Sequence, residues 1–134
     1  KGEIACGYFV STTLKHAGFK LNRYKLAQQA SEIITKSVCG VEKTRYFHDI
    51  DDIINILRLQ NQGLYIIGLD YHVGFIVIEN GGLYFVHSDF INNKVVREPL
   101  RTSEAFSSSQ VFVLGEITHN QSLMKKWKSG TVIY

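Results

Sequence analysis

The pair Asn80-Gly81 constrains the fold most, because it stands between two runs of β-branched and aromatic residues. Asn-Gly readily adopts the positive φ angles of a type I′ turn, so the pair predicts a tight β-hairpin. If Asn80 and Gly81 form a two-residue loop, or residues 79–82 a four-residue loop, Ile78 faces Leu83 and the remaining pairs follow. A three-residue loop would shift the register by one residue.

This register gathers polar residues at the open end of the hairpin. Counting back from the turn, Gly74 faces His87 and His72 faces Asp89. Side chains alternate with period two, so these four residues share one face of the sheet. Because Gly74 leaves a gap beside it, the His87 imidazole can reach His72 at the separations of cross-strand neighbours.

Before Gly63, the apolar residues recur at the three- and four-residue spacings of helices. The predicted helices run from Cys6 to about Ala17, from about Arg23 to Lys36, and from about Asp49 or Asp51 to Leu59. Gly18 is placed to stop the first helix and Asn22 to cap the second. Cys6 would then lie in the first turn of its helix.

After Gly63, the pattern changes to short runs typical of strands. These runs are Leu64–Leu69, Tyr71–Ile78, Leu83–His87, Lys94–Glu98 and Gln110–Ile117. Helices first and strands second indicate an α+β fold with an antiparallel sheet. The chain has 134 residues, 45% of them hydrophobic, and one proline, so we expect a single domain over residues 1–134.

The charge is mild, with a formal net value of +3 at pH 7. Basic residues are scattered, apart from Lys125, Lys126 and Lys128 around Trp127, so we do not expect a nucleic-acid partner. The sequence also contains no signal-peptide pattern and no apolar run of the ~20 residues that a membrane helix needs. Oligomeric state is left open.

Cys6 and His72 are the candidate reactive pair. A thiol is a poor nucleophile until a neighbouring imidazole and a helix N-terminus favour the thiolate, and this sequence offers both. His87 or Asp89 could orient the base, as nucleophilic triads require. An ion pair would lower the pKa of Cys6, raise that of His72 and give a bell-shaped pH profile of activity.

Other readings of the same residue types stay open. Cys6, His72 and His87 could instead form a metal site with an open position. Cys39 is more simply a structural residue than a second nucleophile, although it could pair with Cys6 in an oxidising compartment. The remaining histidines have no partner pattern and are expected at the surface: His16, His48 and His119.

Two motifs resemble those of the NlpC-like cell-wall peptidases, a branch of the papain-like cysteine peptidases. One is Cys6-Gly7-Tyr8-Phe9-Val10 at the head of a helix. The other is His72-Val73-Gly74-Phe75, followed by a glycine turn and a returning strand that ends at Val86-His87-Ser88. The resemblance implies a papain-like fold, with helices packed on the antiparallel sheet and the catalytic cysteine at a helix N-terminus.

The resemblance also implies roles for individual residues. Cys6 would be the nucleophile, His72 the base and His87 the orienting third member, with Asp89 as an alternative. Tyr8 and Gly74 would border the substrate groove. The expected activity is hydrolysis of amide bonds in peptidoglycan stem peptides or related peptides through a thioester, without metal or cofactor. The protein is expected to be secreted, periplasmic or located in the cell envelope.

One departure from the family pattern concerns specificity. Many bacterial members place an acidic residue directly before the cysteine, where this chain has Ala5. A catalytically inactive papain-like module that binds cell-wall or peptide ligands is therefore the alternative function.

Overall fold

The computed structural model describes residues 2–60, 62–89 and 94–133, with side chains from residue 6 onward. Its centre is an antiparallel sheet in the order β2-β7-β3-β4-β5-β6. The strands are β2 (Thr44–Phe47), β3 (Gly63–Gly68), β4 (Val73–Glu79), β5 (Gly82–Asp89), β6 (Lys94–Pro99) and β7 (Phe112–Glu116). The α+β class and the antiparallel sheet are confirmed.

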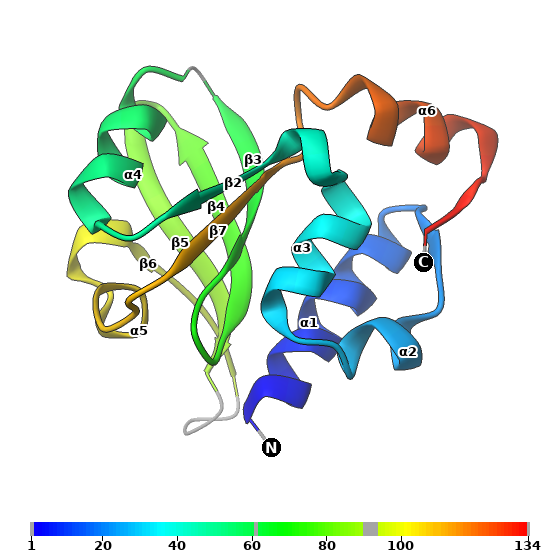
Figure 1. Cartoon of the computed structure of the whole chain (residues 1–134), viewed down its shortest axis with the longest axis horizontal. Coiled ribbons are helices and arrows are strands. Elements are labelled where there is room, and N and C mark those ends of the chain that lie inside the picture. The colour runs from blue at the N-terminus through cyan, green and yellow to red at the C-terminus, as the bar shows by residue number, and fades with distance from the viewer. Residues whose placement is uncertain (1, 61, 90–93, 134) are drawn as a thin grey trace.

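Helices cover both faces of this sheet (Figure 1). They are α1 (Gly2–His16), α2 (Arg23–Ala27), α3 (Ser31–Cys39), α4 (Ile50–Arg58), α5 (Glu104–Ser107) and α6 (Gln121–Ser129), with 3-10 turns at Val41–Lys43 and Leu100–Thr102. A small parallel pair, β1 (Lys20–Leu21) with β8 (Val132–Ile133), lies on the side of α1 and α6.

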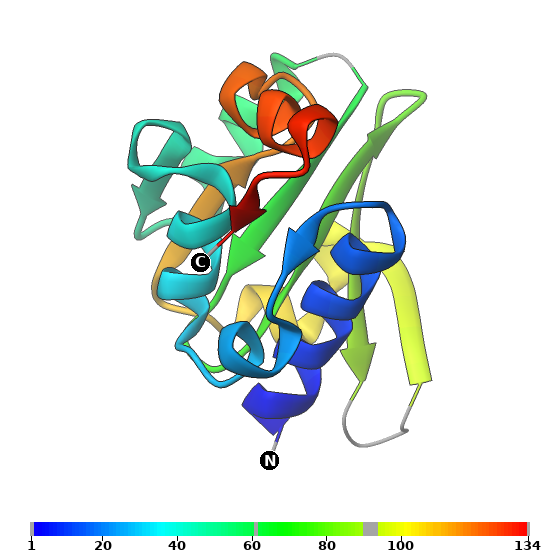
Figure 2. The same cartoon turned by 90° about the vertical axis from the view of Figure 1, so that its right-hand side faces the viewer.

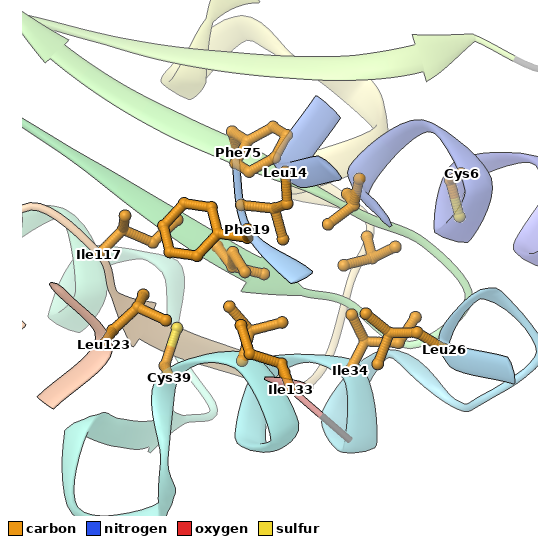
Figure 3. Close-up of a cluster of buried hydrophobic side chains, with 14 residues drawn as sticks. Cys6, Leu14, Phe19, Leu26, Ile34, Cys39, Phe75, Ile117, Leu123 and Ile133 are labelled. Carbon is orange, nitrogen blue, oxygen red and sulfur yellow. The ribbon is translucent and has the colours of Figure 1, made fainter. Parts of the chain in front are cut away.

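Because side chains alternate between the two faces of the sheet, the buried apolar residues form two clusters. Ile66 and Phe75 pack with Cys6 and other apolar residues of α1 and α3 (Figure 3). Their neighbours Ile67 and Ile76 belong to the cluster that contains the apolar residues of α4 and α5. The central strands β3 and β4 therefore each contribute to both clusters, as expected for strands buried on both sides.

The hairpin has the predicted register. Asn80 and Gly81 have φ angles of 50° and 80°, which are those of a type I′ turn. Ile78 pairs with Leu83, and Ile76 pairs with Phe85. The two-residue loop therefore sets which residues of β4 and β5 share a face.

The first helix begins earlier than predicted. α1 starts at Gly2, so Cys6 is its fifth residue and lies in the second turn, not the first. The apolar spacing used for the prediction begins only at Cys6, and helix ends carry the weakest sequence signal. At the other end, Gly18 has a φ of 106° and terminates the helix as expected.

The second predicted helix is wrong as a single element. Its segment forms α2 and α3, separated by residues 28–30, and Ala30 adopts an extended conformation with ψ of 153°. Asn22 caps α2 as predicted. A Cβ added at Gly7 would lie 2.6 Å from the Ala27 carbonyl oxygen, so α1 and α2 approach very closely. The break then redirects the chain into α3.

The third helix agrees with the sequence, and several short elements were not predicted. Asp49 caps α4 by accepting a hydrogen bond of 2.8 Å from the Asp51 amide. The unpredicted elements are β1, β2, α5, α6 and β8. Because β2 precedes α4 and α6 follows β7, the order of helices first and strands second holds only in part.

Candidate active site

Cys6 and His72 line one small cavity of about 80 Å³. Cys6 comes from α1 and is only 1% exposed, whereas His72 lies on the bend just before β4. The other described residues of the lining are Gln29, Ala30, Ser31, Ile34, Asp70, Tyr71 and Val73. The fold thus brings together two residues that are 66 positions apart in the chain.

A chain of hydrogen bonds runs from His72 into the protein. His72 Nε2 lies 2.8 Å from His87 Nδ1, and His87 Nε2 lies 2.7 Å from Glu98 Oε2. Ser103 donates its hydroxyl to the same Glu98 oxygen at 2.7 Å, and its side chain is fully buried. We call these four residues the His72 relay.

Local packing explains why His87 points toward His72. Its ring stacks on Phe85 at a centroid separation of 4.2 Å. A Cβ added at Gly74 would lie 3.0 Å from the His87 Cβ and 2.7 Å from the Val86 carbonyl oxygen. The absence of a side chain at Gly74 therefore makes room for the His87 Cβ and for the Phe85 ring on which His87 stacks, in line with the gap that its place in the hairpin predicted.

The relay determines which nitrogen of His72 is basic. An ionised carboxylate only accepts hydrogen bonds, so His87 donates from Nε2 to Glu98. A neutral His87 then accepts at Nδ1, and His72 donates from Nε2. The lone pair of neutral His72 is therefore on Nδ1, the nitrogen outside the relay.

The predicted ion pair is not supported on the histidine side. Burial, reinforced by the nearby His87, lowers the pKa of His72 from 6.5 to about 4, while Asp89 and Glu98 oppose this shift. The raised His72 pKa that an ion pair with Cys6 would give is therefore not found, because the desolvation penalty for an imidazolium exceeds the attraction of the carboxylates. At neutral pH the resting His72 is neutral.

Asp89 and the predicted groove residues have other positions. Asp89 ends β5 opposite Lys94 and acts on His72 through its charge, whereas the orienting hydrogen bond comes from His87. Neither Tyr8 nor Gly74 is among the described residues that line the cavity. Tyr8 packs edge-on against Tyr24, and Gly74 lies within the sheet.

Asp70 fastens the bend that carries His72. Its carboxylate accepts hydrogen bonds from the backbone of Gln110 at 3.0 Å and of Val111 at 2.9 Å, and from the Ser109 hydroxyl at 3.1 Å. The Gln110 amide is the main reason why the pKa of Asp70 is lowered. The bend itself closes with a 2.7 Å bond from the Leu69 amide to the His72 carbonyl.

Cys39 lies outside the site. Figure 3 shows Cys6 and Cys39 at opposite ends of the same apolar cluster, and no disulfide joins the two. Burial raises the pKa of Cys39 to about 12, so it remains a neutral thiol. A Cβ at Gly115 would lie 2.6 Å from its sulfur, which indicates close packing. The histidines expected at the surface are exposed: His16, His48 and His119.

The metal hypothesis is not supported by the geometry. Among residues 6–60, 62–89 and 94–133, no group of three His, Cys, Asp or Glu side chains is arranged to hold a metal ion. His72 and His87 direct a ring nitrogen at each other, which is incompatible with both nitrogens binding one cation.

Sequence reasoning missed Glu98 and Ser103. Glu98 faces Phe85 across the β5–β6 ladder and therefore shares the face of His87. The connection between these strands contains no Asn-Gly or Asp-Gly pair, so no turn signal defined their register. The one available clue was that the predicted strand Lys94–Glu98 follows the strand that contains His87 and could pair with it.

No model of a known protein family matches this chain, and comparisons with curated proteins and with solved structures also found no match. Within the described residues, none of the helices has the length and apolar character needed to cross a bilayer.

Proposed function

We propose that this chain is a cysteine peptidase or amidase of papain-like organisation. The observation that carries the proposal is the cavity shared by Cys6 and His72, with His72 held by His87 and Glu98. A nucleophile, a base and a group that orients the base are the three parts that such chemistry requires.

The reaction starts from a neutral thiol and a neutral imidazole. As the Cys6 sulfur attacks the amide carbonyl carbon, its proton passes to His72 Nδ1. The imidazolium then protonates the leaving amine, the carbon–nitrogen bond breaks, and a thioester remains on Cys6. Water, deprotonated by His72, attacks the thioester and releases the acid together with the Cys6 thiol.

The relay stabilises the charged intermediate. When His72 is protonated, its Nε2–H donates to His87, which donates in turn to Glu98. The carboxylate thus opposes the desolvation that keeps the resting His72 neutral. His87, Glu98 and Ser103 are positioning residues, since they act through His72.

The oxyanion needs donors other than the Cys6 amide. Only the first four amides of a helix lack an intrahelical acceptor, and Cys6 is the fifth residue of α1. Within the lining, the Ser31 hydroxyl is already bonded to the Leu69 carbonyl at 2.6 Å. We therefore propose that the side-chain amide of Gln29 donates a hydrogen bond to the oxyanion. At present this amide donates to the Lys25 carbonyl over a long distance of 3.3 Å.

The proposed substrates are peptidoglycan stem peptides or related peptides. Because the cavity measures about 80 Å³, it accommodates only the groups around the scissile bond. The rest of a peptide must lie on the surface, where Tyr71, which is 78% exposed, borders the opening.

The test combines product analysis with labelling of the thiol. The protein is incubated with a panel of muropeptides and synthetic peptides, and new amines and acids are identified by mass spectrometry. We expect cleavage by the wild type and by Cys39→Ala, and none by Cys6→Ala or His72→Ala. Iodoacetamide at neutral pH should modify Cys6 faster than Cys39, and His72→Ala should slow this reaction. Cleavage that survives in Cys6→Ala would overturn the proposal.

One observation favours the inactive binding module. Cys6 is 1% exposed, so the thiol is almost closed off before a ligand binds. If the chain is an inactive binding module, wild type releases no product from any peptide, and Cys6→Ala binds muropeptides with unchanged affinity in calorimetry.

A further inference from the structure

Two segments of the chain carry basic residues without any acidic residue. Residues 4–31 and 117–134 contain no Asp or Glu. They hold seven of the 15 Lys and Arg residues, namely Lys15, Lys20, Arg23, Lys25, Lys125, Lys126 and Lys128. The other parts of the chain contain all 12 acidic residues and are net negative. Acidic residues are therefore confined to the other parts of the sequence, whereas basic residues occur in both.

The fold joins these two segments into one basic lobe. β1 pairs with β8, so that Lys20 lies beside Val132. The Trp127 indole donates a hydrogen bond of 2.9 Å to the Ala17 carbonyl. Figure 2 shows the C-terminal end of α1, β1, β8 and α6 on the same side of the molecule. Charges from both chain ends therefore add in one region of surface.

The lobe contains an open groove of about 690 Å³. Lys15, Lys20 and Arg23 line it, together with Tyr24 and Val132. Among the ion pairs of the described residues, none involves these three cations. Their charges are therefore not neutralised by a carboxylate of the described protein, and the groove carries a positive potential.

Arg23 is held in place by neutral groups. Its guanidinium donates to the Tyr24 hydroxyl at 3.0 Å and to the Thr12 hydroxyl at 3.5 Å. Its Nε is covered and has no hydrogen-bond partner among the described residues. These bonds orient the cation without neutralising it, as suits a group that binds an external anion.

We propose that this groove binds a linear polymer of phosphate groups that lacks bases. Several cations along an open channel suit an anion that repeats along a flexible chain. The groove offers little aromatic surface for stacking nucleic-acid bases, because Arg23 lies over the Tyr24 ring and Tyr8 packs against it, although Tyr24 is 56% exposed. The surface is hollow here, whereas a bilayer is contacted best by a convex or flat face.

The groove is separate from the cavity of Cys6 and His72. Asn22 belongs to the groove and Gln29 to the cavity, and the two linings share no described residue. Polymer binding is thus independent of the proposed hydrolysis and can be measured without any substrate.

The single tryptophan of the chain, Trp127, provides the readout. This residue is 44% exposed, and its ring packs beside Phe19, a residue of the groove. Inorganic polyphosphate is titrated at 50 mM salt while Trp127 fluorescence is followed. The triple variant Lys15→Gln, Lys20→Gln, Arg23→Gln is compared with a matched variant outside the lobe, Lys43→Gln, Arg58→Gln, Lys94→Gln. Thermal melting verifies that both variants are folded.

We expect the groove variant to bind at least about 10-fold more weakly and the matched variant to stay within about twofold of wild type, with binding lost as salt rises. Equal weakening in both variants would overturn the proposal, because only net charge would matter. Tighter binding of oligo-dT than of polyphosphate would assign the groove to nucleic acid. Binding to phosphatidylglycerol vesicles without binding to polyphosphate would assign it to a membrane surface. Either result also overturns the proposal.

Discussion

Nε2 of His72 lies 2.8 Å from Nδ1 of His87, so each imidazole determines which nitrogen of the other carries the proton. His87 lies on the sheet face covered by α4 and α5, whereas Cys6 comes from α1 on the opposite face. His72 stands before the first residue of β4, at the end of the sheet, and therefore reaches both. The site depends on this position of His72.

Removing the negative charge at the end of the relay should slow the reaction. Glu98→Gln can still accept a hydrogen bond, but it no longer stabilises the His72 imidazolium through His87. We expect kcat to fall about 10-fold with little change in KM, as for a group that assists acid–base catalysis. Nitrogen NMR of the His72 ring should show the Nε2–H form in wild type and a mixture of tautomers in the variant.

Glu79→Gln is the matched control for this experiment. Glu79 is exposed on β4 and forms a 3.7 Å ion pair with Arg97. We expect no change in kcat and no change in the His72 tautomer. Equal loss of activity in both variants would contradict the role assigned to the relay.

Protonation of His72 should weaken the fold in acid. Its pKa is about 4 in the folded protein and near 6.5 when unfolded, so the unfolded chain binds more protons between these values. Stability is therefore intact above pH 6.5 and falls as pH decreases toward 4. The pKa shift alone corresponds to a loss of ~3 kcal/mol in the free energy of unfolding, and screening by water reduces this loss to about 2 kcal/mol.

The pH dependence is measured by urea unfolding at several pH values. In His72→Gln the loss between pH 6.5 and 4 should be smaller by the amount assigned to His72. If the free energy of unfolding depends on pH in the same way in His72→Gln as in wild type, groups other than His72 cause the loss of stability.

Adding a methyl group at Gly74 should damage both stability and the relay. The new Cβ would lie 2.7 Å from the Val86 carbonyl oxygen and 2.8 Å from the Phe85 ring. Such overpacking destabilises a core by about 1–3 kcal/mol. We expect Gly74→Ala to lower the free energy of unfolding and to reduce activity, because the His87 ring must move.

Gly81→Ala separates packing from backbone strain. Gly81 has a φ of 80°, and apart from its chain neighbours no described residue has a heavy atom within 4 Å of the added Cβ. This variant should lose about 1 kcal/mol from the unfavourable φ angle while its activity per folded molecule is unchanged. An activity loss as large as that of Gly74→Ala would argue against the specific role of Gly74.

The anchor at Asp70 should affect activity more than folding. Asp70→Asn replaces one acceptor oxygen by an amide, so the bonds to the amides of Gln110 and Val111 cannot both persist. We expect a severalfold loss of kcat as the bend before β4 loosens, with a small change in melting temperature. Asp52→Asn on α4 is the control and should leave kcat unchanged.

Much of the sheet could be predicted from local signals. Asn80-Gly81 allows one tight turn, and the period of two then assigns every residue of β4 and β5 to a face. That is why the turn and the alternation alone place Gly74 beside His87. The break between α2 and α3 could not be predicted, since apolar spacing continues through residues 28–30 and the close contact of Gly7 with Ala27 is tertiary.

The sequence by itself determined the hairpin, its register and the pairing of His72 with His87, because turn chemistry and strand alternation act over neighbouring residues. The tertiary structure decided which residues complete the site and how they ionise. Glu98 and Ser103 reach His87 only through strand pairing, and the lowered pKa of His72 follows from burial. The basic lobe arises in the same way, since its two segments meet only when β1 pairs with β8.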